Sequence, residues 1–372
     1  MKENNTIKLI ECPRDAMQGM HDFVPTQLKA DYINSLLKVG FDTIDFGSFV
    51  SPKAIPQLKD TTEVLNKLEL EKTDSKLLAI VANKRGAEDA VNFEEIDYLG
   101  FPFSVSETFQ QRNTNSSIEE SLLRVEEIQN LAVKNKKQLV VYLSMAFGNP
   151  YGDKWDQDII AKWAEKLHKE LDVNILALSD TIGSSDKESI TSLFTTLIPE
   201  FEKVEFGAHL HTTPDTWEEK IVASIESGCR RFDGAIKGYG GCPMAKDELT
   251  GNMPTEKMVS YFEEHGFETG LDHGLFLDSM KMWHIYMVRC VDNSLYTGIT
   301  TDVDRRFREH ESGKGAKYLR ARRPFALVFQ RPVGDRSQAS KLEYAVKQLP
   351  KAKKELIVAG KFDPTQLMEK SE

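Results

Sequence analysis

Two histidines, His209 and His211, stand one residue apart in the segment VEFGAHLHTTPD (204–215) of a chain that has only eight histidines. If this segment is a β-strand, its two-residue period points both imidazoles to the same side. Converging imidazoles could bind a metal ion, or they could be two half-buried polar residues at a strand end. A metal site needs three or four protein ligands, so the pair alone leaves both interpretations open.

The elements that would position these histidines follow from the first 280 residues, where short apolar runs alternate with amphipathic segments. We expect strands at residues 7–11, 43–47, 77–81, 96–101, 139–144, 175–179, 205–211 and 230–236. Eight strand–helix alternations predict an α/β fold, a parallel (β/α)₈ TIM barrel. A doubly wound open sheet is the alternative, but no G-x-G-x-x-G turn follows the first strand.

The helices between these strands carry recognisable end signals. Helical patterns cover residues 25–40, 116–135, 158–171 and 216–228. Ser117 and Glu120 have capping-box spacing at the start of the second segment. The first and last segments end at Gly40 and Gly228, as helices commonly do.

In a parallel barrel, chemistry takes place at the carboxyl ends of the strands. The polar residues that the sequence places there are Arg14, Asp15, Asp45, Asp180, His209, His211, Cys242 and Asn252. Four of them would form a mixed nitrogen and oxygen ligand set: Asp15, His209, His211 and Asn252. Such a set suits Mg²⁺ or Mn²⁺ and differs from a thiolate-rich structural zinc site.

Two further residues could act beside that ion. Arg14, next to a ligand, would stabilise negative charge that develops on an oxygen. Cys242, on a glycine-flanked loop, could serve as an acid–base group. The alternatives are that Arg14 and Asp15 form only a local ion pair and that the glycine-rich segment is an ordinary turn.

Six segments of the chain occur in the same order in the 3-hydroxy-3-methylglutaryl-CoA lyases of the TIM-barrel metallolyase family: PRDAMQ, SFVSPKAIPQ, NTNSSIEES, SDTIG, HLH and GYGGCP…GN. Residues 6–270 resemble this family, and SFVSPK and GGCP indicate the lyase rather than the isopropylmalate or homocitrate synthases. The resemblance implies the same metal ligands, with a catalytic arginine at Arg14 and a loop cysteine at Cys242. It also implies functional carboxylates at Asp45 and Asp180.

The resemblance implies a retro-Claisen cleavage of 3-hydroxy-3-methylglutaryl-CoA, or a close 3-hydroxyacyl-CoA, to acetyl-CoA and acetoacetate. The metal would chelate the substrate's hydroxyl and carboxylate oxygens. Arg14 would stabilise the enolate, and Cys242 would donate a proton. The first loop reads CPRDA where the family has GPRDG, and Thr212 replaces the usual aspartate. These differences leave a related aldolase or acyltransferase on the same barrel as an alternative.

The charge of the chain changes sign near residue 280. Residues 281–372 hold 19 Lys and Arg against 11 Asp and Glu, a net of +8, whereas the first 280 residues have a net of −18. This difference indicates two modules with different partners. A basic module is typical of proteins that bind polyanions such as DNA, although a merely soluble basic domain would show the same excess.

The basic segment is similar to the GIY-YIG nuclease domain over residues 283–360, with HIY and YTG in place of the signature. The resemblance implies a nuclease site made of Tyr286, Tyr296, Arg306, His310 and Glu343. Mg²⁺ would be held at Glu343 for phosphodiester hydrolysis. A DNA contact with salt-sensitive affinity is expected from Lys314, Lys317, Arg320, Arg322 and Arg323. The alternatives are an inactive remnant that only binds nucleic acid and a chain whose main function is DNA processing.

We therefore expect a barrel lyase domain at residues 1–278, a small α+β GIY-YIG domain at 283–362 and a tail at 363–372. The start of the chain lacks an apolar signal core, and no stretch could span a membrane. Four scattered cysteines do not resemble a disulfide framework, so the expected location is the cytoplasm. The expected partners are an acyl-CoA substrate, DNA at the basic module and no membrane, and a homodimer is compatible with the barrel.

Overall fold

The computed structural model describes residues 5–20, 23–241, 250–281, 283–323, 325–334 and 336–367. The chain divides into two compact units, one of residues 1–26 and 36–272, the other of residues 27–35 and 273–372. Within the described ranges, no helix has the length and apolar character that crossing a membrane requires.

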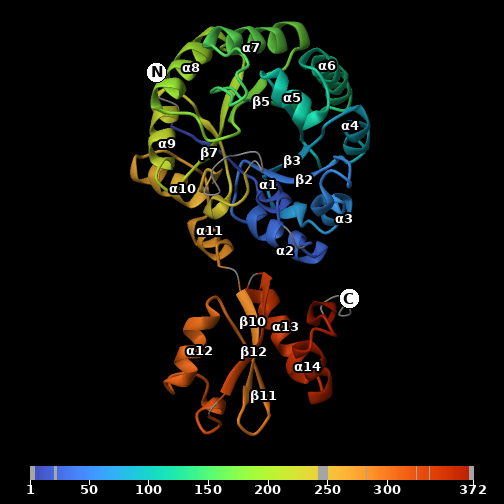
Figure 1. Cartoon of the computed structure of the whole chain (residues 1–372), viewed down its shortest axis with the longest axis vertical. Helices are drawn as coiled ribbons and strands as arrows, with labels where there is room; N and C mark the ends of the chain where they lie inside the picture. The colour runs from blue at the N-terminus through green and yellow to red at the C-terminus, as the bar shows by residue number, and fades with distance from the viewer. Residues whose placement is uncertain are drawn as a thin grey trace. The chain divides into compact units, whose positions relative to one another are not determined.

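The first unit is built on a closed barrel of eight parallel strands (Figure 1). The strands are β1 (Lys8–Glu11), β2 (Thr43–Ser48), β3 (Lys76–Ile80), β4 (Tyr98–Ser104), β5 (Gln138–Ser144), β6 (Ile175–Asp180), β7 (Glu205–Thr212) and β8 (Arg231–Gly234). Each pairs in parallel with its neighbours, and β8 pairs with β1 to close the ring. The predicted TIM barrel is confirmed, and no strand end differs from its expected position by more than three residues.

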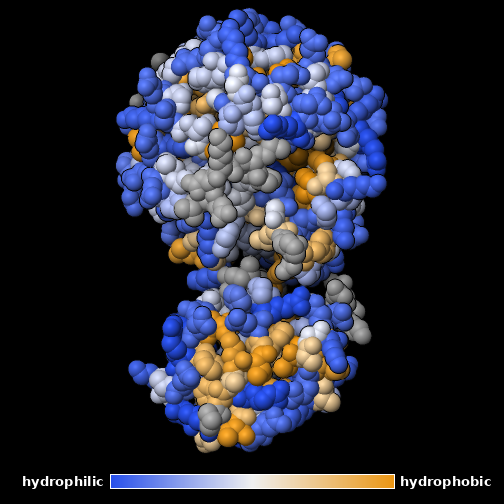
Figure 2. Space-filling model, viewed as in Figure 1, coloured by the Kyte–Doolittle hydropathy of each residue, from blue (hydrophilic) through white to orange (hydrophobic). Residues whose placement is uncertain are grey.

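Helices surround the barrel, and the surface around it in view is largely hydrophilic (Figures 1 and 2). The helices up to residue 279 are α1 (Pro13–Gln18), α2 (Thr26–Leu37), α3 (Thr61–Leu65), α4 (Lys84–Ala90), α5 (Glu107–Thr114), α6 (Ile118–Lys134), α7 (Gln157–Leu171), α8 (Lys187–Glu200), α9 (Trp217–Glu226), α10 (Thr255–Glu264) and α11 (His273–Ser279). Short 3₁₀ turns are η1 (Pro56–Leu58), η2 (Leu70–Lys72) and η3 (Ile236–Gly238). In α7, for example, Ile160, Ala164 and Leu167 are buried at helical spacing, which gives the helix one apolar face toward the strands.

The helix-end signals expected from the sequence are present. The Ser117 side chain accepts from the Glu120 backbone N–H, and the Glu120 carboxylate accepts from the Ser117 N–H, so the predicted capping box is confirmed. Gly40 and Gly228 follow their helices with φ of 93° and 94°. This left-handed conformation strains residues that carry a Cβ, which explains glycine at both positions.

The barrel interior is packed with apolar side chains from several strands, including Leu78 of β3, Val140 of β5 and Ala177 of β6, which are completely buried. A two-residue strand, β9 (Gly251–Asn252), runs antiparallel to the end of β7. In this pairing His211 lies opposite Asn252. The backbone thus brings the segment after β8 to the carboxyl end of the barrel.

The second unit contains an antiparallel sheet of three strands in the order β11-β10-β12. Its elements are β10 (Trp283–Cys290), β11 (Leu295–Thr300), α12 (Val303–Glu311), η4 (Lys317–Leu319), β12 (Phe325–Gly334), α13 (Arg336–Gln348), α14 (Lys351–Val358) and η5 (Pro364–Leu367). Alternate residues of β10 serve two cores: Ile285 and Met287 pack with Leu342 of α13, whereas Tyr286 packs with Val303 of α12. The sheet therefore separates two small hydrophobic clusters.

Candidate metal centre

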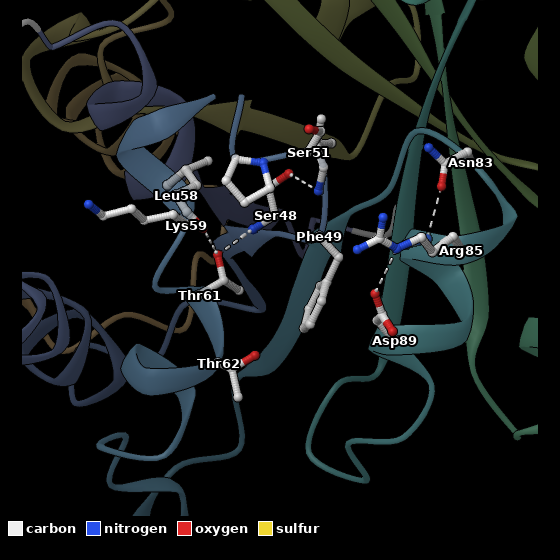
Figure 3. A pocket seen from close by; sticks show the side chains of 13 residues that line it. Ser48, Phe49, Ser51, Leu58, Lys59, Thr61, Thr62, Asn83, Arg85 and Asp89 are labelled. Atoms are coloured by element: carbon white, nitrogen blue, oxygen red, sulfur yellow. Dashed lines mark hydrogen bonds and ion pairs between the residues drawn. The ribbon is translucent and has the colours of Figure 1, made fainter. Parts of the chain in front are cut away.

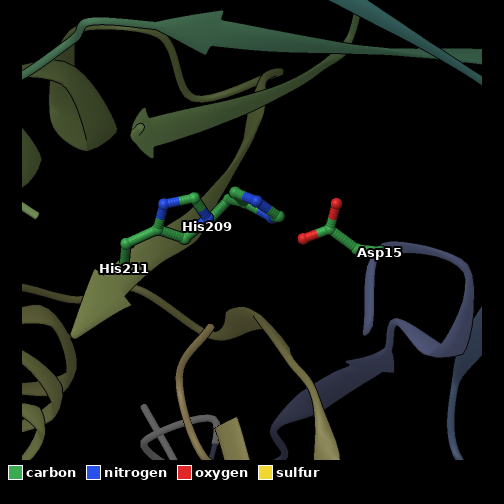
Figure 4. Close-up of side chains that lie close together, drawn as sticks. All are labelled: Asp15, His209 and His211. Carbon is green, nitrogen blue, oxygen red and sulfur yellow. The ribbon is translucent and has the colours of Figure 1, made fainter. Parts of the chain in front are cut away.

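Three side chains with metal-binding atoms converge at the carboxyl end of the barrel (Figure 4). His209 and His211 extend from β7, and Asp15 extends from α1, the short helix that follows β1. One ligand atom of each residue lies within 4.8 Å of the others. Asp15 and His211 are buried, while the His209 side chain keeps 14% of its surface exposed. The same-side geometry expected for the two histidines is present.

Hydrogen bonds at Nδ1 orient both imidazoles. His209 Nδ1 lies 3.1 Å from Asp233 Oδ2, and His211 Nδ1 lies 2.9 Å from the Thr181 carbonyl oxygen. A carbonyl can only accept, so His211 Nδ1 carries the proton and Nε2 carries the lone pair. That Nε2 is buried and lacks a hydrogen-bond partner among the described residues. A buried nitrogen lone pair held in this way suits a metal cation, as in other histidine metal sites.

The carboxylate of Asp15 is held by donors on both oxygens. Oδ1 accepts from Arg14 Nη1 at 2.9 Å and from Gln18 Nε2 at 2.6 Å, and Oδ2 accepts from Asn252 Nδ2 at 2.7 Å. Burial acts to raise the pKa of Asp15, but Arg14 and the two imidazoles outweigh it and hold this pKa below its ordinary value. The group is therefore an anion at neutral pH, as a metal ligand must be.

The charge of the carboxylates also acts on the histidines. Burial alone would lower the pKa of His209, but its bond to Asp233 and the charges of Asp233 and Asp15 raise it above the usual value. Burial and the neighbouring His209 lower the pKa of His211. The second imidazole is accordingly neutral at pH 7, the form that binds metal.

Asn252, the fourth expected ligand, is brought to the same place by β9. Its Nδ2 donates to Asp15 and, at 2.9 Å, to the Tyr239 carbonyl oxygen. Gly240 allows this approach, because a Cβ there would lie 2.8 Å from Asn252 Nδ2 and 2.6 Å from the Asp15 carbonyl oxygen. The structure thus gathers all four expected ligands, with Asn252 joined to the cluster through Asp15.

Arg14 forms a buried double contact with Asp45 of β2. Its Nε lies 3.0 Å and its Nη2 2.5 Å from Asp45 Oδ2, and the side chains are 9% and 1% exposed. Burial raises the pKa of Asp45, and the guanidinium opposes this shift. The local Arg14–Asp15 ion pair considered as an alternative is present, but Arg14 also reaches Asp45, so the guanidinium is fixed from two sides.

One other expected site residue, Asp180, lies outside the three-residue cluster. Asp180, at the end of β6, accepts from Lys220 Nζ at 2.7 Å and from the backbone N–H groups of Ser184 and Ser185 at 2.8 and 2.9 Å. It is therefore bound by its own loop and by α9, and it is not one of the three clustered ligand residues. Cys242 lies outside the described residues.

Sequence reasoning missed three partners of this site: Gln18, Asp233 and Lys220. Asp233 lies in β8, whose residues are all buried, and Lys220 stands on the buried face of α9, one residue before Ile221. A charged residue at a position that the pattern assigns to the interior is a signal that it has a buried partner. Gln18 lies four residues after Arg14 on one helix face and shows no such signal.

A pocket of about 190 Å³ opens beyond the ends of β2 and β3 (Figure 3). Its polar lining includes Ser48, Ser51, Thr61 and Asn83, and it does not include the three clustered ligand residues. The candidate centre is thus identified by the chemistry of its donor atoms and not by the shape of a cavity.

In the second unit, three aromatic rings expected at the nuclease-type site lie together. Tyr286 Oη is 2.7 Å from His310 Nε2, and the Tyr296 ring centroid is 5.6 Å from that of His310. His310 Nδ1 accepts from the Ala316 N–H, so the neutral imidazole carries its proton on Nε2 and donates to Tyr286. Burial raises the pKa of Tyr286 and lowers that of His310.

The remaining expected residues of this unit are placed as follows. Arg306 pairs with Glu309 at 2.7 Å, and it opposes the effect of burial on the pKa of Tyr286 through a hydrogen bond and its charge, so it belongs to the same neighbourhood. Glu343, on α13, pairs with Lys347 at 2.8 Å. Within the described part of the chain, no hydrogen bond or ion pair joins Glu343 to the aromatic group.

The five basic residues of this unit that were expected to contact DNA fall into two groups. Arg322 pairs with Asp292 at 3.0 Å, and Arg323 donates to the His310 carbonyl oxygen. Lys314, Lys317 and Arg320 are exposed and form no ion pair with any described residue. Of the five, these three are the exposed cations with neither an ion-pair partner nor a side-chain hydrogen bond in the described part of the chain.

Comparisons with known proteins agree with this geometry. Residues 7–282 match the family described as HMGL-like, and residues 282–355 match the GIY-YIG catalytic domain. The chain is 32% identical to hydroxymethylglutaryl-CoA lyase of Bacillus subtilis over 269 residues, which are 72% of this chain and 89% of that protein.

Two solved structures are similar to the barrel unit. An HMG-CoA lyase from Acinetobacter baumannii, in complex with coenzyme A and 3-methylmalate, has a TM-score of 0.69 and 30% identity, covering 76% of this chain and 91% of that one. The Bacillus subtilis HMG-CoA lyase has a TM-score of 0.70 and 28% identity, covering 86% of this chain and 99% of that one.

Proposed function

This chain belongs to the HMGL-like family, and from that premise we propose that it is a divalent-metal-dependent carbon–carbon lyase. Its proposed substrate is 3-hydroxy-3-methylglutaryl-CoA or a close 3-hydroxyacyl-CoA, and its products are acetyl-CoA and acetoacetate. The names of the relatives support a lyase, and the coenzyme A bound in one of their structures supports an acyl-CoA substrate.

The observation that carries this proposal is the cluster of Asp15, His209 and His211, in which the Nε2 of His211 is buried and has no hydrogen-bond partner among the residues that the structure describes. Asn252 completes the proposed ligand set. A divalent cation held there would supply Lewis acidity toward the hydroxyl and carboxylate oxygens of the substrate. The hard oxygen donors favour Mg²⁺ or Mn²⁺.

The chain's own residues would then divide the chemistry. The hydroxyl group of the substrate would lose its proton to solvent and become the ketone of acetoacetate as the C2–C3 bond breaks. The electron pair of that bond would pass to the thioester carbonyl as an enolate. Arg14, which Asp15 and Asp45 hold in a buried position, would stabilise that negative oxygen. Cys242 would return a proton to the enolate carbon and so release acetyl-CoA. Asp180 would act from a distance, by holding its loop.

The test is a product assay with the full chain. We expect acetyl-CoA and acetoacetate to appear from 3-hydroxy-3-methylglutaryl-CoA when Mg²⁺ or Mn²⁺ is present, and to disappear with a chelator or in His209→Ala. Full activity of His209→Ala, or no cleavage by the intact protein with either metal, would remove the proposal. Acyl-CoA condensation without cleavage would instead assign the barrel to the related aldolases and acyltransferases.

The chain also carries a GIY-YIG domain, and we propose that this domain binds DNA and hydrolyses its backbone with Mg²⁺ at Glu343. The hydrogen bond between Tyr286 and His310 and the exposed cations Lys314, Lys317 and Arg320 favour this second function. We expect nicking of branched DNA with Mg²⁺ and its loss in Glu343→Ala, with Lys347→Ala as the matched control. Binding without nicking would show a remnant that only contacts nucleic acid.

Three organisational predictions accompany these functions. We propose a lyase domain at residues 1–278, a GIY-YIG domain at 283–362 and a tail at 363–372. The cytoplasm is the proposed location, and the buried free thiols Cys12, Cys229 and Cys290 suit its reducing conditions. A homodimer stays a prediction that the mass of the protein in solution would test.

A further inference from the structure

Lys220 is a buried lysine close to the candidate metal centre. It lies on α9, and its side chain is 2% exposed. Lysine is rarely buried unless its ammonium group is fully paired, so this position calls for a specific reason.

The ammonium group has three acceptors around it. Lys220 Nζ donates to Asp180 Oδ2 at 2.7 Å, to the His211 carbonyl oxygen at 2.8 Å and to the Gly183 carbonyl oxygen at 3.2 Å. These acceptors belong to the end of β6, the loop that follows it and the end of β7. A single charge therefore joins two neighbouring strand ends of the barrel.

The loop joined in this way is the one that orients His211. Asp180 holds its own loop through the backbone N–H groups of Ser184 and Ser185. Within that loop, the Thr181 carbonyl oxygen accepts the proton of His211 Nδ1 at 2.9 Å. Lys220 thus binds the His211 backbone and, through Asp180, the segment that fixes the His211 side chain.

We propose that Lys220 is a positioning residue for His211, which keeps the lone pair of Nε2 directed at the metal site. The inference rests on the proposed function insofar as it concerns metal binding. Its first link, the orientation of the imidazole, depends only on contacts within this chain. Outer partners of histidine ligands commonly change metal affinity by about 10–100-fold when they are removed.

A single substitution would leave Asp180 buried and uncompensated, which is strongly destabilising. We therefore pair Lys220→Met with the double variant Lys220→Met/Asp180→Asn, which removes both charges and restores a neutral interior. Lys169→Met is the matched control, because Lys169 forms a helix ion pair with Glu165 that is exposed.

The experiment measures Mn²⁺ binding by calorimetry, thermal unfolding, and ¹⁵N NMR of histidine-labelled metal-free protein. The chain has only eight histidines, and His211→Gln would assign the signal of interest. We expect the Nδ1–H signal of His211 to be lost and the Kd for Mn²⁺ to rise about 10–100-fold in the double variant, at an unfolding temperature near that of the parent. Lys169→Met should match the parent in all three measurements.

Parental Mn²⁺ affinity and an intact Nδ1–H signal in the folded double variant would overturn the proposal and reduce Lys220 to a structural ion pair. If the parent protein binds no Mn²⁺ while the Nδ1–H signal still depends on Lys220, the proposed function fails and the positioning of His211 stands.

Discussion

Glu11, the last residue of β1, offers a sharp test of how the barrel end is held together. Its carboxyl group is completely buried and accepts from the Ile236 N–H at 2.9 Å and from Thr255 Oγ1 at 2.6 Å. Burial raises the pKa of Glu11 from 4.5 to about 8. We predict that Glu11→Gln removes a pH dependence of barrel stability.

The magnitude follows from proton linkage. The carboxyl group of Glu11 binds its proton more tightly in the folded state than in the unfolded state. The stabilisation that this proton gives to the folded barrel is therefore fully present below pH 4.5 and is lost as the pH rises through about 8. Between about pH 5 and about pH 8 this group would cost the wild-type barrel roughly 3 to 4 kcal/mol of unfolding free energy. Glutamine is neutral throughout, and its amide can accept from Ile236 and donate to Thr255.

The assay is urea unfolding of wild type and Glu11→Gln across this pH range. Trp155, Trp163 and Trp217 report on the barrel unit, so both proteins would carry Trp283→Phe to silence the tryptophan of the second unit. All other titrating groups are shared and cancel in the difference. The two stabilities should diverge steadily toward high pH, with the variant the more stable there. Parallel curves would refute a protonated Glu11.

Further predictions concern the metal site, a helix end and the basic loop. Asp233→Asn should raise the Kd for Mn²⁺ by about 10–100-fold in calorimetry. An unchanged Kd would show that Asp233 does not orient His209 for metal binding. Ser117→Ala should lower the unfolding free energy by about 1 kcal/mol in chemical denaturation. An unchanged unfolding free energy would show that the capping box does not stabilise the protein. Replacing Lys314, Lys317 and Arg320 together by alanine should reduce the salt dependence of DNA binding by about 3 in log–log slope; the parental slope would place the contact elsewhere.

The barrel could be predicted from the sequence because parallel strands buried on both faces read as apolar runs. The run LVVYLS at 139–144 is an example, and all its residues are buried in β5. The last strand was expected at 230–236 but covers Arg231–Gly234, since polar residues within it blur the pattern. Strand ends are set by pairing with neighbours, which a single segment does not encode.

The metal ligands could also be predicted from the sequence, because the barrel rule assigns chemistry to strand ends and Asp15, His209 and His211 stand at such ends. The residues that hold these ligands in place could not be predicted. The contact of Lys220 with Asp180 joins residues forty positions apart, and it exists only once α9 packs on the barrel. This is why Asp180 was expected among the catalytic groups, although the structure occupies its carboxylate with a lysine and its own loop.

The antiparallel pairing of β9 with β7 also limits how this protein can vary. His211 and Asn252 are neighbours because backbone hydrogen bonds set the register, and the segment between them spans residues 212–251. Side chains alternate along a strand, so a shift of one residue would turn the Asn252 amide away and present Gly251 or Met253 instead. The same segment contains α9 and β8, with Lys220 and Asp233, so insertions and deletions are tolerable only outside these elements and where they leave the two-residue strand in place. Relatives of this chain can differ in length here and still keep the same centre.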